Sequence, residues 1–491
     1  KTLSTAYEKL KEDGTRSSNI IVIMGTYSSN SIYNYKDGNS NDDTYAKKAT
    51  LTGKYNGIDY NAELYFYSGS GTYRYMAEDT TFQNMIFYGN RDQMYFYLQG
   101  YSLTIGENVT MQNYATSNTN QGLLGGNAPA FHIFCGWNQY NYSTLPRKDA
   151  EVIIKSGTYG RIVGGGSPGT SSGQGQQISH DFMGSSKSDS FNITITIDIQ
   201  NSTTSNQYDY DVNLLTGGSA AGNNYSNVVQ NIKNGSVGRL IGGSIGDSAY
   251  RPRNWNYPEN TFLGTATINV TGGSIDELYG GCLGRNMDVV GSSYASGNTC
   301  DSYFYGTVNI NISGGRIESN IYGAGAGGVT GYSPNSSDPY KNYGQEFDTG
   351  VEINITGGTI EGDIFGGGYG YTEYLNQNVT AVDGGTLYGD STINISESPV
   401  INGNIYASGC GYNYRNKQEI AQMEGNSIIN ISGTPDLNGT IFGAGNGVSG
   451  YTEMAKLIGT STVNISTDLD TEIYGGGNVA KVEGNTNINI I

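Results

Sequence analysis

Apolar and polar residues alternate strictly in short segments of the C-terminal half. Residues 307–313 (TVNINIS) place valine and isoleucine on one face and threonine, asparagine and serine on the other. Alternation with β-branched residues predicts a strand with one buried face. Two further short apolar runs follow, ending in the Ile-Tyr-Gly of residues 321–323. Because glycine tolerates positive φ, the intervening glycines are expected at corners between three short strands.

This segment is one copy of a repeat. Its copies recur at intervals of 34 to 43 residues, a period typical of stacked arrays. Stacking would place the strands of successive repeats about 4.8 Å apart, and each fully buried isoleucine would contribute about 1.5–3 kcal/mol. The sequence therefore predicts an all-β parallel solenoid that forms one continuous domain. The aligned asparagines are Asn231, Asn269, Asn311, Asn354, Asn394, Asn430 and Asn464.

The N-terminus has a different pattern. Leu3, Tyr7 and Leu10 share one helical face, and Glu8 follows Thr5 at the spacing of a capping box. We expect a short helix over residues 1–14 that caps the first coil. The predicted organisation is a capping helix and first strand (1–20), irregular aromatic-rich coils (21–130) and regular repeats with insertions along one edge (131–491).

Several segments carry a family resemblance. Residues 1–10 (KTLSTAYEKL), 19–28 (NIIVIMGTYS), 80–90 (TTFQNMIFYGN) and 97–113 (YLQGYSLTIGENVTMQN) resemble the opening of right-handed parallel β-helix proteins of the pectin-lyase-like superfamily, especially large bacterial surface proteins. The GGxIxGxIYGGG lines resemble the same proteins. The resemblance implies a single-stranded right-handed parallel β-helix on a bacterial cell surface, in a superfamily that includes lyases, hydrolases and adhesins. The cellulose-binding tapirins are similar only in their β-helical, tyrosine-rich character.

Insertions of unequal length separate the repeats, and all occupy the same phase of the coil. They should therefore emerge along one edge. They contain both tryptophans and many tyrosines beside asparagine, serine and arginine, a mixture that suits sugars or protein surfaces. The alternative is that these rings only pin the loops to the solenoid wall. The candidate ligand-binding residues are Trp137, Tyr140, Arg251, Arg253, Trp255, Tyr257, Tyr340 and Tyr343.

The charge balance narrows the choice of partners. The formal net charge of −18 disfavours nucleic acid, which needs clustered Lys and Arg, and also disfavours an anionic membrane surface. No apolar run approaches the roughly 18 residues of a membrane-spanning helix. Lys1 is followed by no signal-peptide pattern, so we expect a mature or excised segment of a longer protein. The charged fraction of only 14% and the abundance of glycine and tyrosine suit an extracellular surface protein, which we expect to be monomeric.

Few residues of the sequence are candidates for catalysis. Only two histidines are present, His132 and His180, and we expect no metal and no cofactor. Two carboxyl groups about 5–5.5 Å or 6.5–9.5 Å apart would suit a glycosidase, so a polysaccharide lyase or glycoside hydrolase is the alternative function. The carboxylates near the predicted corners are Asp276, Glu277, Glu318, Glu361, Asp363 and Asp470.

Two further features of the sequence each allow two interpretations. Cys282 and Cys300 flank one insertion and could close it with a disulfide, or they could be buried free thiols. The outward rungs, such as Asn309, Asn311 and Ser313, could bind ice or a crystalline polysaccharide, or they could form a solvated face stabilised by side-chain ladders. Our principal prediction is a non-catalytic bacterial adhesin segment that binds polysaccharide or host glycoprotein through the aromatic edge.

Overall fold

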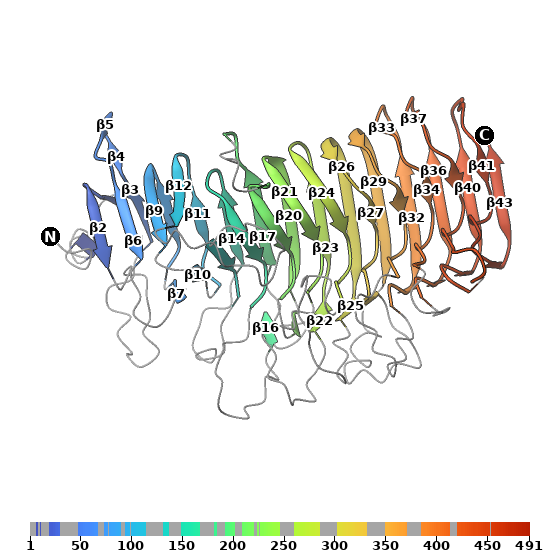
Figure 1. Cartoon of the computed structure of the whole chain (residues 1–491), viewed down its shortest axis with the longest axis horizontal. Helices are drawn as coiled ribbons and strands as arrows, with labels where there is room; N and C mark the ends of the chain where they lie inside the picture. Colours follow the sequence, from blue (N-terminus) through green and yellow to red (C-terminus); the bar gives the residue numbers. More distant parts are fainter. Residues whose placement is uncertain are drawn as a thin grey trace.

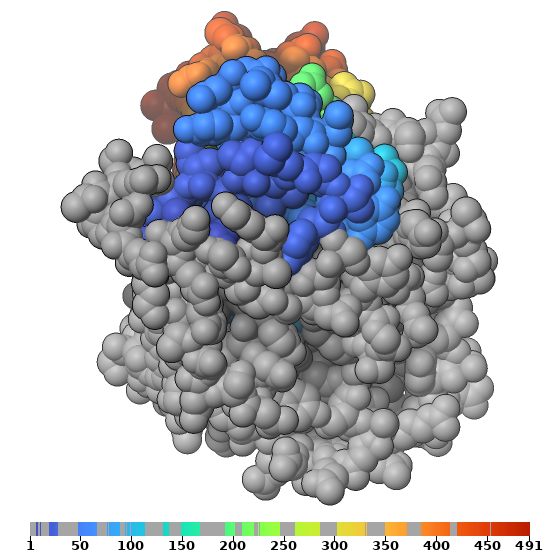
Figure 2. Space-filling view, turned by 90° about the vertical axis from the view of Figure 1, so that its left-hand side faces the viewer, coloured from blue at the N-terminus to red at the C-terminus, as the bar shows by residue number. Residues whose placement is uncertain are grey.

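The computed structural model shows an all-β protein built from large parallel sheets, an arrangement consistent with a parallel β-solenoid (Figure 1). Its strands stack along the long axis from β1 to β43, and Figure 2 views that stack from its N-terminal end. The structure describes residues 6, 7, 10, 19–29, 48–66, 73–76, 78–89, 94–98, 100–113, 131–136, 149–166, 181–183, 192–201, 209–219, 223, 224, 226–245, 260–284, 302–330, 349–370, 384–412, 420–451 and 453–491.

Within these residues the largest sheet has 28 strands, most of which lie in two rows. Row 1 consists of β1 (Ile20–Val22), β3 (Ala49–Thr52), β8 (Thr80–Gln83), β11 (Leu103–Ile105), β14 (Ala150–Ile154), β17 (Asn192–Asp198), β20 (Asn227–Asn234), β23 (Ala266–Val270), β26 (Thr307–Ile317), β29 (Gly350–Ile360), β32 (Asp390–Ile395), β36 (Ser427–Ile431), β40 (Ser461–Ile465) and β43 (Thr486–Ile490).

Row 2 runs beside it. It consists of β7 (Tyr73–Tyr75), β10 (Met94–Tyr97), β13 (Phe131–Phe134), β15 (Tyr159–Val163), β18 (Val212–Thr216), β21 (Ser236–Ile241), β24 (Ser274–Tyr279), β27 (Ile321–Tyr322), β30 (Ile364–Phe365), β34 (Ile405–Tyr406), β38 (Ile441–Phe442) and β41 (Ile473–Tyr474), with β33 (Val400–Ile401) and β37 (Asp436–Leu437) at the corner between the rows.

The remaining strands form smaller sheets. A nine-stranded sheet, row 3, contains β16 (Asp181–Met183), β19 (Asn223–Asn224), β22 (Asn260–Leu263), β25 (Ser302–Tyr305), β28 (Val329–Thr330), β31 (Leu387–Tyr388), β35 (Met423–Glu424), β39 (Leu457–Ile458) and β42 (Val482–Glu483). A four-stranded sheet contains β2 (Thr26–Ser29), β6 (Glu63–Phe66), β9 (Met85–Gly89) and β12 (Val109–Asn113). The antiparallel pair β4 (Lys54–Tyr55) and β5 (Ile58–Asp59) projects from the stack (Figure 1).

The alternation predicted from sequence is confirmed. In β26, Val308, Ile310 and Ile312 are buried in the main core, whereas Thr307, Asn309 and Asn311 are partly exposed. Parallel pairing aligns each buried residue with its equivalent in the next repeat, so that Ile312 pairs with Ile355. The Ile312 column is therefore apolar along the stack, whereas the buried Gln230 interrupts the column of Ile310 and serines continue the column of Val308 from Ser391 onward.

Glycine is required where the chain turns into row 1. At Gly425, φ is 159°, and a Cβ would lie 2.2 Å from the carbonyl oxygen of Gly389 in the previous repeat. Gly459 and Gly484 repeat this geometry, each against the preceding glycine of the column. Close approach of successive backbones thus explains this recurring glycine.

The outer face of row 2 is covered rather than open. Tyr322 stacks on Tyr279 and on Phe365, with ring centroids 5.1 Å apart in both pairs. These rings are buried in a second apolar cluster, distinct from the main core. The Ile-Tyr-Gly line therefore supplies both clusters, since Ile321 faces the main core and Tyr322 faces the other way.

The structure describes three residues of the segment predicted to form the N-terminal helix. Ala6, Tyr7 and Leu10 are helical, and Tyr7 is buried in the main core. Of the aromatic residues expected in the irregular coils, Phe96 and Tyr97 are buried, while Tyr65 is half-exposed and stacks on Tyr88 at 4.3 Å.

Candidate binding groove

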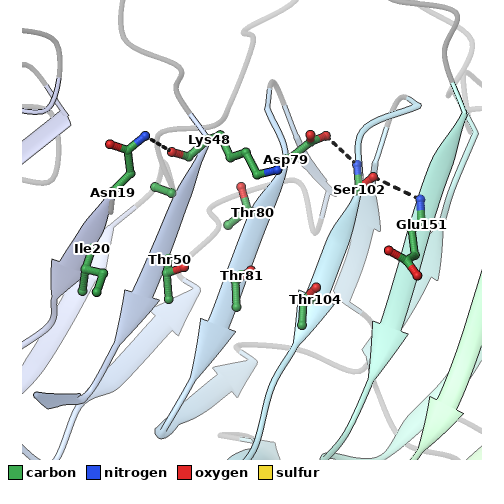
Figure 3. A pocket seen from close by; sticks show the side chains of 11 residues that line it. Asn19, Ile20, Lys48, Thr50, Asp79, Thr80, Thr81, Ser102, Thr104 and Glu151 are labelled. Atoms are coloured by element: carbon green, nitrogen blue, oxygen red, sulfur yellow. Dashed lines mark hydrogen bonds between the residues drawn. The ribbon is translucent and has the colours of Figure 1, made fainter. Parts of the chain in front are cut away.

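An open groove lies on the outer face of the first strands of row 1 (Figure 3). Its volume is about 550 Å³, within the range of about 300–1,000 Å³ typical of ligand pockets. It crosses β1, β3, β8, β11 and β14, so it runs along the stack. The lining residues are Asn19, Ile20, Lys48, Ala49, Thr50, Asp79, Thr80, Thr81, Ser102, Thr104 and Glu151.

The groove lies in the early part of an outward column of side chains, which holds mainly threonine there and asparagine in the later repeats. Strand register places Ile20, Thr50, Thr81 and Thr104 in a single column. The same column continues into the asparagines of the later repeats, from Asn231 to Asn489. Ile153 and Thr196 lie between the threonines of the groove and the first asparagine of the column.

In the asparagine part of the column, the side chains bond to one another. The side-chain amide of each asparagine donates to the side-chain oxygen of the asparagine one repeat earlier, at 2.7 to 3.0 Å, from Asn269 through Asn489. The outward asparagines therefore bond to one another and form a side-chain ladder, as in the second of the two interpretations given above for the polar rungs. The threonine part of the column is lined instead by hydroxyl groups beside Ile20, whose side chain is 39% exposed.

The neighbouring outward column carries the charges of the groove. Lys48 and Asp79 lie on adjacent strands, because the Ala49 N–H donates to the Asp79 carbonyl at 3.3 Å, and Figure 3 shows the lysine side chain extending toward Asp79. The Asp79 carboxylate accepts the Ser102 N–H at 2.9 Å. Ser102 Oγ in turn accepts the Glu151 N–H at 3.0 Å. These hydrogen bonds fix the side chains of Asp79 and Ser102 to the backbone of the next strand.

The eight residues predicted to bind ligand all lie outside the described residues, so the aromatic edge remains a prediction. The structure does revise the segments assigned to insertions. Parts of these segments form strands of row 3, as β25 and β31 do. Aromatic residues there are part of the fold: Phe262 and Phe304 are buried and stack at 4.8 Å.

Five of the six predicted corner carboxylates make structural contacts, and the sixth, Asp470, is exposed. Asp276 accepts hydrogen bonds from the Tyr210 hydroxyl at 2.7 Å and the Ser319 hydroxyl at 2.8 Å. Glu277 pairs with Arg239 at 2.7 Å. Arg316 bridges Glu318 at 2.8 Å and Glu361 at 2.7 Å. Asp363 accepts the Asn404 N–H at 2.7 Å. These groups tie neighbouring repeats together at the corner.

Cys282 is a buried free thiol. Its sulfur accepts the Ser244 N–H at 3.2 Å and contacts the Tyr303 carbonyl at 3.5 Å, and burial raises its pKa to about 12. Cys300 lies outside the described residues. The free-thiol alternative therefore describes Cys282, and the proposed disulfide is not formed at this residue.

The described residues contain no cluster of His, Cys, Asp and Glu suited to a metal ion. They also form no helix that is long and apolar enough to span a membrane. Comparisons with protein-family models, with curated proteins and with solved structures found no match.

Sequence reasoning did not single out the groove. All of its residues except Glu151 precede the predicted regular repeats (131–491), and no consensus aligns Lys48, Asp79 and Glu151. The available signal was the succession of outward threonines in the early strands, at the positions that asparagine occupies later. Only the strand register makes that correspondence visible.

Proposed function

We propose that this chain is a right-handed parallel β-helix of the pectin-lyase-like type that acts as a bacterial surface adhesin and binds an extended polysaccharide along the row 1 groove. The β-helix assignment is supported by the parallel register from β1 to β43 and by the helical residues at the position expected for a cap. The low charged fraction of 14% and the abundance of glycine and tyrosine support an extracellular location.

The observation that carries the binding proposal is the shape of the groove. It extends across successive strands about 4.8 Å apart, and a polymer lying along the stack would meet a threonine hydroxyl at each of β3, β8 and β11. Hydroxyl, amide and carboxylate groups match the hydroxyls of a sugar, and the exposed Ile20 side chain matches its apolar C–H face. An elongated polar groove fits a linear polysaccharide better than a compact small molecule.

The spacing of the two acids in the groove does not match a retaining glycosidase. Asp79 and Glu151 are two strands apart along the stack, which puts their backbones roughly 10 Å apart, more than the separation of about 5–5.5 Å between the carboxyl groups of such an enzyme. An inverting enzyme, with carboxyl groups about 6.5–9.5 Å apart, is distinguished from a binding protein by the product assay below. Five of the six predicted corner carboxylates, all except Asp470, already have hydrogen-bond or ion-pair partners.

A glycan array followed by affinity electrophoresis tests the proposal. In Thr81→Phe an aromatic ring fills the middle of the groove without touching the core, and we expect affinity to fall at least about tenfold, the equivalent of 1.4 kcal/mol. The matched control is Thr392→Phe, another half-exposed outward threonine of row 1, which lies outside the groove and should bind like wild type.

The outcomes separate the alternatives. Equal binding by both variants would exclude the groove and make the aromatic edge the next surface to test, with a Trp137→Ala, Trp255→Ala double variant. Release of reducing ends or of unsaturated products from the bound polysaccharide would place the protein among the hydrolases or lyases. Absence of binding to any glycan would refute the proposal.

A further inference from the structure

The charges in the groove are distributed unevenly along its length. At the end near β1, the ammonium group of Lys48 and the carboxylate of Asp79 lie on adjacent strands. Opposite charges on neighbouring strands offset one another. At the other end, the groove terminates at the exposed Glu151 (Figure 3).

The Glu151 carboxylate has no counter-ion among the residues that the structure describes. Its neighbours across the strands are Ser102 on one side and Thr194 on the other, both uncharged. Along its own strand, Asp149 adds another acid, whose carboxylate already accepts the Asn192 N–H at 2.8 Å and the Asn192 side-chain amide at 3.2 Å. The nearest outward-facing cation further along, Lys155, is four residues away, about 13 Å in an extended strand and beyond the Debye length of about 8 Å at physiological salt.

This arrangement favours a positively charged ligand over a negatively charged one. An unpaired carboxylate at the end of a groove, within a chain of net charge −18, repels polyuronates and other anionic polymers. A ligand ammonium group at the same place would form a charge-assisted hydrogen bond, which is about twice as strong as a neutral one.

We infer that the groove binds a polysaccharide of amino sugars, with a free ammonium group of the polymer bound by Glu151. This inference rests on the proposed function, because it names the class of polysaccharide for the same groove. The threonine hydroxyls and Ile20 contact the sugar rings, and Glu151 discriminates between polymers by charge.

The experiment is calorimetric titration of the protein with four hexasaccharides and one peptide, at a pH where the amines are protonated. The sugars are the hexamers of glucosamine, N-acetylglucosamine, β-1,4-glucose and galacturonate, and the peptide is hexalysine. We expect the glucosamine hexamer to bind most tightly and the galacturonate hexamer most weakly. In Glu151→Gln, affinity for the glucosamine hexamer should fall about tenfold or more, the effect of losing one hydrogen bond to a charged group. Affinity for the glucose hexamer should fall less, because a neutral sugar hydroxyl makes no ion pair with Glu151.

Glu352→Gln is the matched control. Glu352 is an exposed glutamate in the same outward column, connected to Glu151 through Thr194, Val229, Thr267 and Asn309, and it lies outside the groove. This variant should bind every ligand like wild type.

Each outcome decides between the claims. If the glucose and glucosamine hexamers bind equally, or galacturonate binds best, the amino-sugar assignment is wrong while polysaccharide binding stands. If hexalysine binds as tightly as the glucosamine hexamer, the groove selects charge alone and the sugar assignment is wrong. If no hexasaccharide binds, the proposed function is refuted together with this inference.

Discussion

The side-chain amide of Asn311 donates a 2.9 Å hydrogen bond to the side-chain oxygen of Asn269, which lies 42 residues earlier in the chain. Asn354 makes the same bond to Asn311 at 3.0 Å. Each asparagine therefore joins two repeats on the outer face, as the apolar ladders do inside. The ladder holds the repeats in register, because a shift by one residue would place isoleucine opposite asparagine.

Replacing Asn311 with alanine should destabilise the protein by about 1–3 kcal/mol, since both hydrogen bonds are lost and two half-buried neighbours lose a partner. Asn309→Ala is the control, because Asn309 is outward-facing on the same strand but lies in the adjacent column. Urea unfolding of the two variants measures the difference. Equal midpoints would mean that the ladder contributes nothing to stability.

A charge introduced into an isoleucine ladder should have an effect that depends on the face of the strand on which it lies. Ile312 is 1% exposed, whereas Thr267 on the adjacent strand β23 faces outward, is partly exposed and has the uncharged neighbours Val229 and Asn309. Ile312→Asp buries an unpaired charge and should destabilise by about 3–5 kcal/mol. Thr267→Asp leaves the carboxylate on the outer face and should change the melting temperature little. A wild-type melting curve for Ile312→Asp would contradict the inward assignment.

Acid should weaken the fold partly through His132. Burial, and then the nearby charge of Arg161, lower the pKa of His132 from 6.5 to about 3. The folded protein keeps this imidazole neutral while the unfolded chain protonates it, so stability is retained above pH 6.5 and is lost as pH falls toward 3. The loss from this group should approach about 1.4 kcal/mol per pH unit between these limits.

The measurement is urea unfolding of wild type and His132→Gln at several pH values across that interval. The variant should lose less stability between pH 6.5 and 4 than wild type does, because glutamine does not titrate. The carboxylates contribute equally to both proteins, so the difference between the two slopes reports the histidine. Parallel slopes would show that His132 is not held neutral in the folded state.

The local alternation of apolar and polar residues determined which segment repeats and which of its side chains face the core. Alternation in segments such as residues 307–313 specified which side chains face inward, since side chains point to opposite faces of a strand in turn. The alignment of Asn231 with Asn269 and Asn311 agrees with the strand register. These features could be predicted because each depends on a few adjacent residues that recur at a regular period.

The candidate site depended on tertiary structure. Lys48, Asp79 and Glu151 share one groove only because their strands stack across connections of very different length, and no local signal states which residues become neighbours. Tyr322 likewise faces a second apolar cluster rather than solvent, because other chain segments cover the outer face of row 2. The sequence by itself determined the ladders, through the two-residue period of the strand, whereas pairing between distant segments decided where the polar face is hollow and which charges meet there.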